Sequence, residues 1–145
     1  MAQVKVKKLD ERAVMPSHGS EGAAGYDLYA CADAEVTVPA HSTVMIHTGL
    51  AFTLPEGTFG AVFARSGLAA KQGLRPANCV GVIDSDYRGE VMVALHNDCA
   101  EERTVKAGER VAQMVLLPFI PMELDETDEL PDTLRGAGGF GSTGS

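Results

Sequence analysis

The chain has 145 residues, of which 45% are hydrophobic and 22% are charged, so it can bury the core of one globular domain. Its formal net charge of −8 argues against broad contact with nucleic acid or with an anionic membrane, because both partners require a basic surface. An anionic ligand must therefore meet a few well-placed arginines.

The cysteines give no sign of a metal site or of a disulfide framework. Cys31, Cys79 and Cys99 are odd in number and lack CxxC spacing, and the four histidines also lack metal-ligand spacing. We expect reduced, mostly buried thiols. No apolar run follows the basic N-terminal residues, and no stretch approaches the roughly 18 residues of a membrane helix. We therefore expect a cytoplasmic protein with no membrane partner.

Alternation of apolar and polar residues recurs along the chain and predicts short strands. Turn sequences such as VPAHS, LPEGT, DYRGE and VKAGE separate them at the spacing of an all-β sandwich or jelly roll. Between them, Ser66–Gln72 favours a helix, with Ser66 able to act as its N-cap. The pattern predicts an all-β, jelly-roll-like barrel or sandwich with one short helix. The predicted strands begin at Val4, Glu35, Thr43, Thr58, Glu90 and Glu109.

The C-terminal part differs from the rest in composition. After Pro121 the chain becomes acidic and loses periodicity, which is typical of a solvated connector, and residues 135–144 read RGAGGFGSTG. We expect a β domain at residues 1–134 and a flexible, glycine-rich C-terminal segment at residues 135–145. Alone, this tail fits either a disordered end or a lid in which Arg135 grips a phosphate and Phe140 stacks on a flat ring.

Two internal stretches have chemistry that suits a nucleotide. In RSGLAAK, Arg65 and Ser66 could form an oxyanion site at the start of the helix, or Ser66 could simply cap it beside a surface arginine. Residues 78–91, NCVGVIDSDYRGEV, predict a strand, a tight polar turn and a return strand, with Asp84 and Asp86 on one face if the strand continues. Asp84 is either an ordinary turn residue or a carboxylate that activates a water or anchors a sugar hydroxyl.

Two further polar residues lie within apolar segments. Asp27 in AAGYDLYA is either a turn or edge residue or a magnesium ligand. In GERVAQM, alternation puts Gln113 on the same face as Val111 and Val115, where its amide interrupts an apolar row. That amide requires a partner, which the backbone, water or a ligand could supply.

In this order, five stretches resemble the five motifs of the trimeric dUTPase family: AAGYDLYA, PEGTFGAVFARSGLAAK, NCVGVIDSDYRGEV, GERVAQM and RGAGGFGSTG. The match runs over nearly the whole domain. It departs from the family pattern at Ala64, where members often have proline, and alanine leaves the backbone before Arg65 freer. The resemblance implies a jelly-roll protomer, a homotrimer with active sites shared between subunits, and a C-terminal tail that closes another subunit's site.

The resemblance also implies the activity of a dUTP diphosphatase. Such an enzyme hydrolyses dUTP to dUMP and pyrophosphate by Mg²⁺-assisted attack of water on the α-phosphate, supplying dUMP for thymidylate synthesis and keeping uracil out of DNA. By similarity, Asp84 and Gln113 are catalytic, and Asp27 orients the hydrated Mg²⁺ through water. The implied substrate-binding residues are Arg65, Ser66, Gly67, Asn78, Gly81, Val82, Ile83, Tyr87, Arg135, Gly139, Phe140, Gly141, Ser142 and Thr143.

The implied basis of selectivity is physical. The backbone of residues 78–83 would pair with the edge of uracil, and cytosine would leave buried polar groups unpaired. A pocket wall close to uracil C5 would exclude the methyl group of thymine by steric clash. The ring of Tyr87, lying under the sugar, would refuse a 2′-hydroxyl.

Two alternatives come from other functional classes. A dCTP deaminase, or a bifunctional deaminase and diphosphatase, would share the β architecture, but we find no counterpart of its deaminating glutamate region. A nucleotide-binding regulatory protein would have the fold without turnover, but Asp84, Gln113 and Arg135 are intact.

Overall fold

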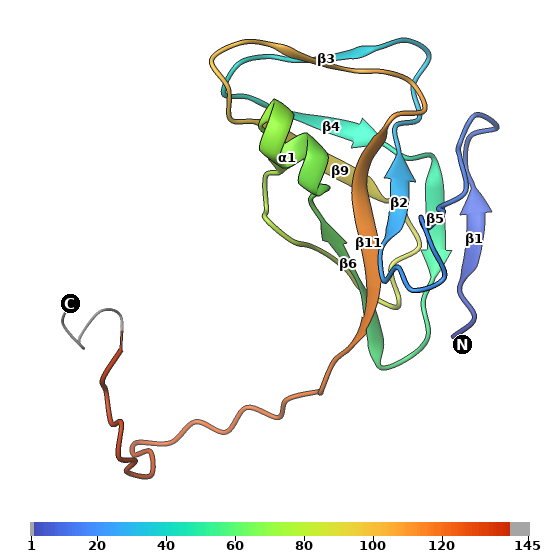
Figure 1. Cartoon of the computed structure of the whole chain (residues 1–145). Coiled ribbons are helices and arrows are strands. Elements are labelled where there is room, and N and C mark those ends of the chain that lie inside the picture. The colour runs from blue at the N-terminus through green and yellow to red at the C-terminus, as the bar shows by residue number, and fades with distance from the viewer. Residues whose placement is uncertain (1, 140–145) are drawn as a thin grey trace.

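The described residues 2–139 of the computed structural model form eleven strands and one short helix (Figure 1). The elements are β1 (Lys5–Lys8), β2 (Tyr26–Tyr29), β3 (Val36–Val38), β4 (Thr43–His47), β5 (Leu50–Thr53), β6 (Thr58–Phe63), α1 (Ser66–Gln72), β7 (Leu74–Pro76), β8 (Gly81–Ile83), β9 (Met92–Asn97), β10 (Arg103–Val105) and β11 (Arg110–Pro118). The predicted all-β fold with one helix is confirmed.

The strands form two larger and two smaller antiparallel sheets. One sheet has the order β2-β11-β6-β8, and another has the order β4-β9-β7. The pairs β1-β5 and β10-β3 complete the sandwich. All four sheets contribute to a single buried apolar cluster, and this shared core makes residues far apart in the sequence neighbours in space.

Alternation along the strands sets which side chains enter the core. On β9, Val93 and Leu95 are buried while Met92 is exposed. The predicted segment from Thr43 to Leu54 divides into β4 and β5 at Gly49, whose φ of +67° turns the chain and suits a residue without a side chain.

The predicted hairpin within residues 78–91 is wrong. β8 pairs with β6, whereas β9 pairs with β4 and β7, so the intervening residues 84–91 carry the chain from one sheet to the other. The strand also ends at Ile83, so Asp84 and Asp86 do not share a strand face. The return segment is drawn to β5 instead, because the Val91 N–H donates to the Leu50 carbonyl at 2.8 Å.

The helix lies where it is predicted, but its cap does not. Arg65 is the N-cap residue, with an extended backbone, and its carbonyl accepts the N–H of Ala69. Ser66 is therefore the first helical residue, and no side-chain hydrogen bond caps this end. At the other end, Gly73 adopts the left-handed conformation that commonly ends a helix.

The expectation of mostly buried thiols is wrong in part. All three cysteines are free, but Cys79 is exposed, and Cys31 and Cys99 are only half-buried. Within the described residues, no helix is long and apolar enough to cross a membrane.

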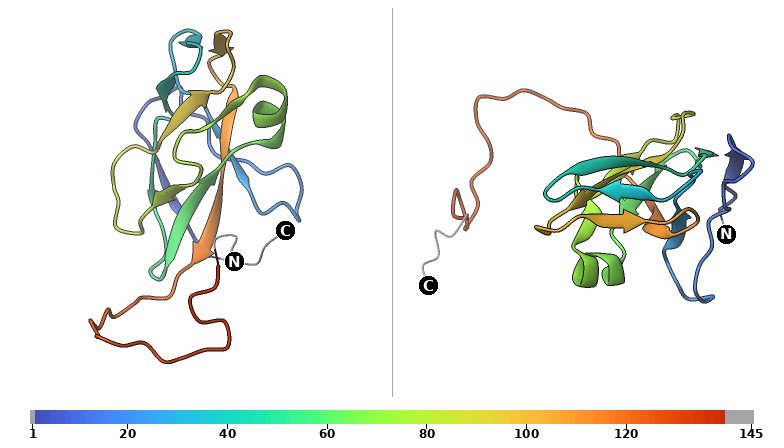
Figure 2. Two further views of the ribbon diagram at one scale, coloured as in Figure 1. Left: turned by 90° about the vertical axis from the view of Figure 1, so that its left-hand side faces the viewer. Right: turned by 90° about the horizontal axis from the view of Figure 1, so that it is seen from above.

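The C-terminal segment leaves the strands after Pro118. Its side chains from Phe119 to Gly138 are exposed, and it forms neither helix nor strand. Figures 1 and 2 show this segment extending away from the sandwich. The acidic connector therefore has the solvated character that its composition predicts.

Asn97 provides a test of how the fold is stabilised. Its fully buried amide donates to the carbonyls of Val38, Pro39 and Glu101, and its oxygen accepts the N–H of Cys99 at 2.9 Å. Because Asn97→Ala leaves these buried groups without a partner, we expect the free energy of unfolding to fall by about 2–3 kcal/mol in urea denaturation.

The exposed Thr104→Ala on β10 is a suitable control and should change the free energy of unfolding by less than about 0.5 kcal/mol. Equal stability of the two variants would contradict a structural role for the Asn97 hydrogen bonds.

Candidate functional site

The middle of β11 brings two of the sequence-predicted residues side by side. Gln113 pairs with Asp27 of β2 on one side and with Phe63 of β6 on the other. Two residues beyond Phe63, the chain reaches Arg65 at the start of α1. Three predicted site residues from distant parts of the sequence therefore lie together at one edge of the sandwich.

Asp27 lies between two arginines. Its Oδ1 accepts a hydrogen bond from Arg65 Nε at 2.8 Å, and its Oδ2 pairs with Arg110 Nη1 at 3.3 Å. The Asp27 side chain is 15% exposed and that of Arg65 is 26% exposed, so solvent screens their pair less than a surface ion pair. The Asp27 carboxylate thus holds the guanidinium group of Arg65 in place through its Nε.

Gln113 holds the chain just before Arg65. Its Nε2 donates to the carbonyl of Ala64 at 2.9 Å, so the partner that the half-buried amide requires is the backbone. A Cβ added at Gly25 would lie 3.1 Å from Gln113 Cδ and nearer still to Oε1. The amide can occupy this position only because residue 25 has no side chain.

The local charge at this junction is opposite to that of the whole chain. Two guanidinium groups surround one carboxylate, which leaves an excess of one positive charge where the protein carries −8 overall. In the part of the chain that the structure describes, Arg65 uses only Nε for hydrogen bonding. Its two terminal nitrogens are therefore available to an anionic ligand such as phosphate.

Sequence reasoning did not single out Arg110. This residue lies inside the GERVAQM stretch, three positions before Gln113. Its approach to Asp27 depends on an irregularity in the pairing of β11 with β2 between Arg110 and Ala112, which local alternation does not reveal.

The neighbouring residues of α1 face solvent. Ser66 and Gly67 are exposed, and the position where a Cβ of Gly67 would lie is open. The start of the helix is therefore accessible beside Arg65.

A second group of predicted residues belongs to the segment around β8. Asn78, Val82, Asp84 and Tyr87 are exposed, while Gly81 and Ile83 are half-buried. Within the described ranges, no hydrogen bond or ion pair joins this group to Asp27, Arg65 or Gln113. The two groups thus have no direct polar contact within the described part of the chain, although β8 belongs to the same sheet as β2, β11 and β6.

The predicted residues of the tail form a third group. Arg135 Nε donates to the carbonyl of Gly138 at 2.8 Å in a local turn, and Gly139 is half-buried. Phe140, Gly141, Ser142 and Thr143 lie outside the described residues.

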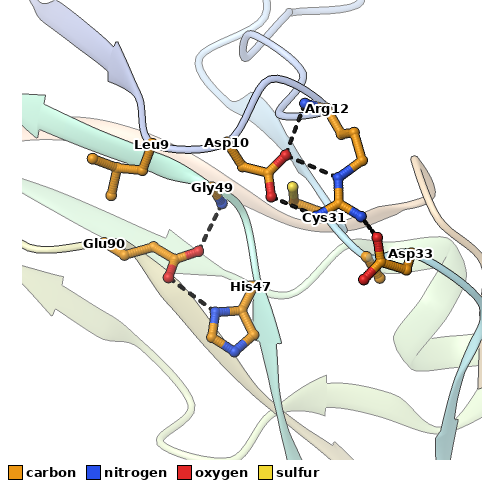
Figure 3. Close-up of a pocket in the computed structure, with 9 residues that line it drawn as sticks. Leu9, Asp10, Arg12, Cys31, Asp33, His47, Gly49 and Glu90 are labelled. Atoms are coloured by element: carbon orange, nitrogen blue, oxygen red, sulfur yellow. Dashed lines mark hydrogen bonds and ion pairs between the residues drawn. The ribbon is translucent and has the colours of Figure 1, made fainter.

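A polar cavity of about 420 Å³ is lined by none of the predicted site residues (Figure 3). Its lining includes Asp10, Arg12, Cys31, His47 and Glu90. Hydrogen bonds from Arg12 hold the pKa of the Asp10 carboxyl far below its usual value. Burial, helped by the charge of Asp10, raises the pKa of the Cys31 thiol.

Glu90 ties this cavity to the segment that carries Tyr87. Its Oε1 accepts the N–H of Gly49 at 2.8 Å, and its Oε2 pairs with His47 Nδ1 at 2.9 Å. Figure 3 shows the carboxylate pointing toward both partners. The cavity wall thereby fixes the end of the turn at residues 84–91.

Comparison with known proteins identifies relatives over almost the whole chain. The dUTPase family matches residues 11–144. A deoxyuridine 5′-triphosphate nucleotidohydrolase of Desulfitobacterium hafniense is 52% identical and aligns over 99% of both chains. A protein of the same name from Oryza sativa subsp. japonica is 50% identical over 97% of this chain and 80% of its own length.

Solved structures have the same fold. The dUTPase of Staphylococcus bacteriophage 80alpha with dUpNHpp has a TM-score of 0.85, 29% identity and 99% coverage of both chains. A mutant dUTPase of phage phi11 of S. aureus, whose structure reveals the coordination of a structural Mg(II) ion, has a TM-score of 0.78 and 25% identity over 88% of this chain and 97% of its own. The jelly-roll expectation and the resemblance of the five motifs are both confirmed: this chain belongs to the dUTPase family.

Proposed function

We propose that this protein hydrolyses dUTP to dUMP and pyrophosphate, supplying dUMP for thymidylate synthesis and keeping uracil out of DNA in the cytoplasm. The observation that carries the proposal is the convergence of Asp27, Arg65 and Gln113, which come from three of the five family motifs. A relative that is about half identical is named for this reaction. A structural relative contains the analogue dUpNHpp.

We propose further that the active site is completed by three copies of the chain. Within the described part of one protomer, no hydrogen bond or ion pair joins the Asp27–Arg65–Gln113 group to the segment around Asp84, and the tail extends away from the sandwich. Association of copies in a homotrimer would let one chain supply the arginine junction, a second the Asp84 segment and a third the lid at residues 135–145.

In the proposed reaction, a water attacks the α-phosphorus in line with the leaving pyrophosphate. Asp84 accepts a proton from this water and orients it, and it also meets the sugar 3′-hydroxyl. Gln113 assists near the water and the α-phosphate. The outer phosphates are bound by Arg65 and Ser66, with Gly67 beside them. The free terminal nitrogens of Arg65 offset the negative charge of these phosphates.

The remaining residues bind the nucleoside and close the site. The backbone from Asn78 through Gly81, Val82 and Ile83 pairs with uracil, and Tyr87 packs under the sugar. The lid closes over both ends of the nucleotide. Phe140 covers the base. The phosphates are bound by Arg135 and by the other lid residues, Gly139, Gly141, Ser142 and Thr143.

The residues at the junction fit a magnesium ion that is held mainly by the triphosphate. Both oxygens of Asp27 accept from arginine, yet each retains a lone pair that can accept a hydrogen from a metal-bound water. Asp27 would therefore hold Mg²⁺ through water, as the family resemblance implies. Bound Mg²⁺ would supply charge neutralisation at the phosphates.

The direct test is pyrophosphate release from dUTP, measured with Mg²⁺ beside dTTP, dCTP and UTP. We expect fast release from dUTP and release at least about 100-fold slower from the other three, because each leaves a buried polar group unpaired or clashes with the pocket. Ammonia release from dCTP would contradict the proposal and favour a deaminase. Tight dUTP binding without pyrophosphate release would favour a regulatory protein.

Asp84→Asn tests the catalytic base. We expect turnover of dUTP to fall by about 100-fold to 10,000-fold, because an amide cannot accept the proton of the attacking water. Calorimetric binding of dUpNHpp should change little. The matched control is Asp86→Asn, an exposed carboxylate two residues away, and equal losses in the two variants would remove Asp84 from this role.

Truncation after Leu134 tests the lid. The described part of the segment beyond β11 is exposed and adds nothing to the buried core. We therefore expect a chain of residues 1–134 to have an unchanged thermal unfolding midpoint and assembly state, with turnover of dUTP reduced by about 100-fold or more. Loss of folding would make the tail structural, and full activity would exclude it from the site.

A further inference from the structure

The ring of Tyr87 lies directly on the backbone of Gly89. A Cβ added at Gly89 would lie 2.6 Å from Tyr87 Cζ and 3.0 Å from Cε2, and nearer still to the hydroxyl oxygen. Gly89 does not have a positive φ, so its backbone conformation is open to other residues. A glycine is needed here for the space that the ring fills.

A hydrogen bond fixes the far end of the same ring. The Tyr87 hydroxyl donates to the carbonyl of Glu90 at 2.9 Å. Tyr87 is 43% exposed, so part of its side chain remains accessible to a ligand. Gly89 and the Glu90 carbonyl together form the seat on which Tyr87 rests.

The protein interior holds this seat in place. The Glu90 carboxylate accepts the N–H of Gly49, and Val91 is fully buried and hydrogen-bonded through both its N–H and its carbonyl, to Leu50 and Thr48. Glu90 also lines the cavity in Figure 3. The turn at residues 84–91 therefore ends on a well-anchored support, although the side chains of Asp84, Asp86, Tyr87 and Arg88 are exposed.

We propose that Gly89 determines the selectivity of the site for deoxyribose over ribose by setting the height of the Tyr87 ring. The proposal depends on the proposed function, in which Tyr87 packs under the sugar of dUTP. A ring seated on a glycine lies where a 2′-hydroxyl would otherwise fit. Any side chain at residue 89 pushes the ring off this seat, so the close fit to deoxyribose on which the preference rests is lost. Gly89 is thus a positioning residue that acts through Tyr87.

The test compares the ratio of kcat/KM for dUTP to kcat/KM for UTP in the wild type and in Gly89→Ala. We expect this ratio to fall by about tenfold or more, the scale on which pockets discriminate single small groups. Calorimetric binding of dUMP and UMP should show the same loss of preference without relying on turnover. The thermal unfolding midpoint should change little, because the added methyl group meets only the end of an exposed side chain.

The matched control is Gly22→Ala, at a position where a Cβ meets no atom within 4 Å and φ is not positive. It should leave the ratio unchanged. Tyr87→Phe keeps the ring on Gly89 but removes the hydrogen bond to Glu90, and it should retain most of the preference. A preserved ratio in Gly89→Ala, or a large loss in Tyr87→Phe alone, would overturn the proposal.

Failure of the proposed function gives a different result. If the wild type does not hydrolyse dUTP, or if Tyr87→Ala leaves the ratio unchanged, the role of Tyr87 is wrong and the inference fails with it. If Tyr87→Ala lowers the ratio while Gly89→Ala does not, only the role of Gly89 is wrong.

Discussion

The pairing of β11 with both β2 and β6 is the constraint on which the arginine junction depends. One register sets Gln113 opposite Asp27, and the other sets it opposite Phe63, so the end of β6 delivers Arg65 to the same place. A shift of one residue in either register would turn Gln113 to the opposite face of the sheet. The core therefore specifies the junction, because apolar neighbours such as Met114 and Val62 fix both registers.

The sequence was sufficient for elements whose signal is local. Alternation located β1, β6, β9 and β11, and helix-favouring residues located α1. It missed β7 and β10, which have three residues each, although it found β3, of the same length, in the alternating run from Glu35. It also misread residues 78–91 as a hairpin, because alternation predicts strands without specifying which sheet each strand joins.

The same limit applies to the candidate site. Motif resemblance named Asp27, Arg65 and Gln113, but their mutual contacts arise from pairings between residues far apart in sequence. Arg110 and the supporting glycines carry no signal of their own in a single sequence. Gly25 and Gly89 become informative only when the side chain that occupies their missing Cβ position is known.

The arginine junction and the turn that carries Asp84 are held in place by different kinds of contact. The arginine junction lies on paired strands and is held by charge, with Asp27 between two guanidiniums. The turn that carries Asp84 and Tyr87 has no such pairing of its own, yet Glu90 and Val91 anchor its end to the interior. The catalytic role proposed for Asp84 on this exposed turn requires such an anchor, because orientation of an attacking water depends on positions fixed to within a fraction of an ångström. Since both groups are anchored within one protomer, the proposed association of copies would assemble the site by docking preformed surfaces, and the tail, which extends away from the sandwich, would close it.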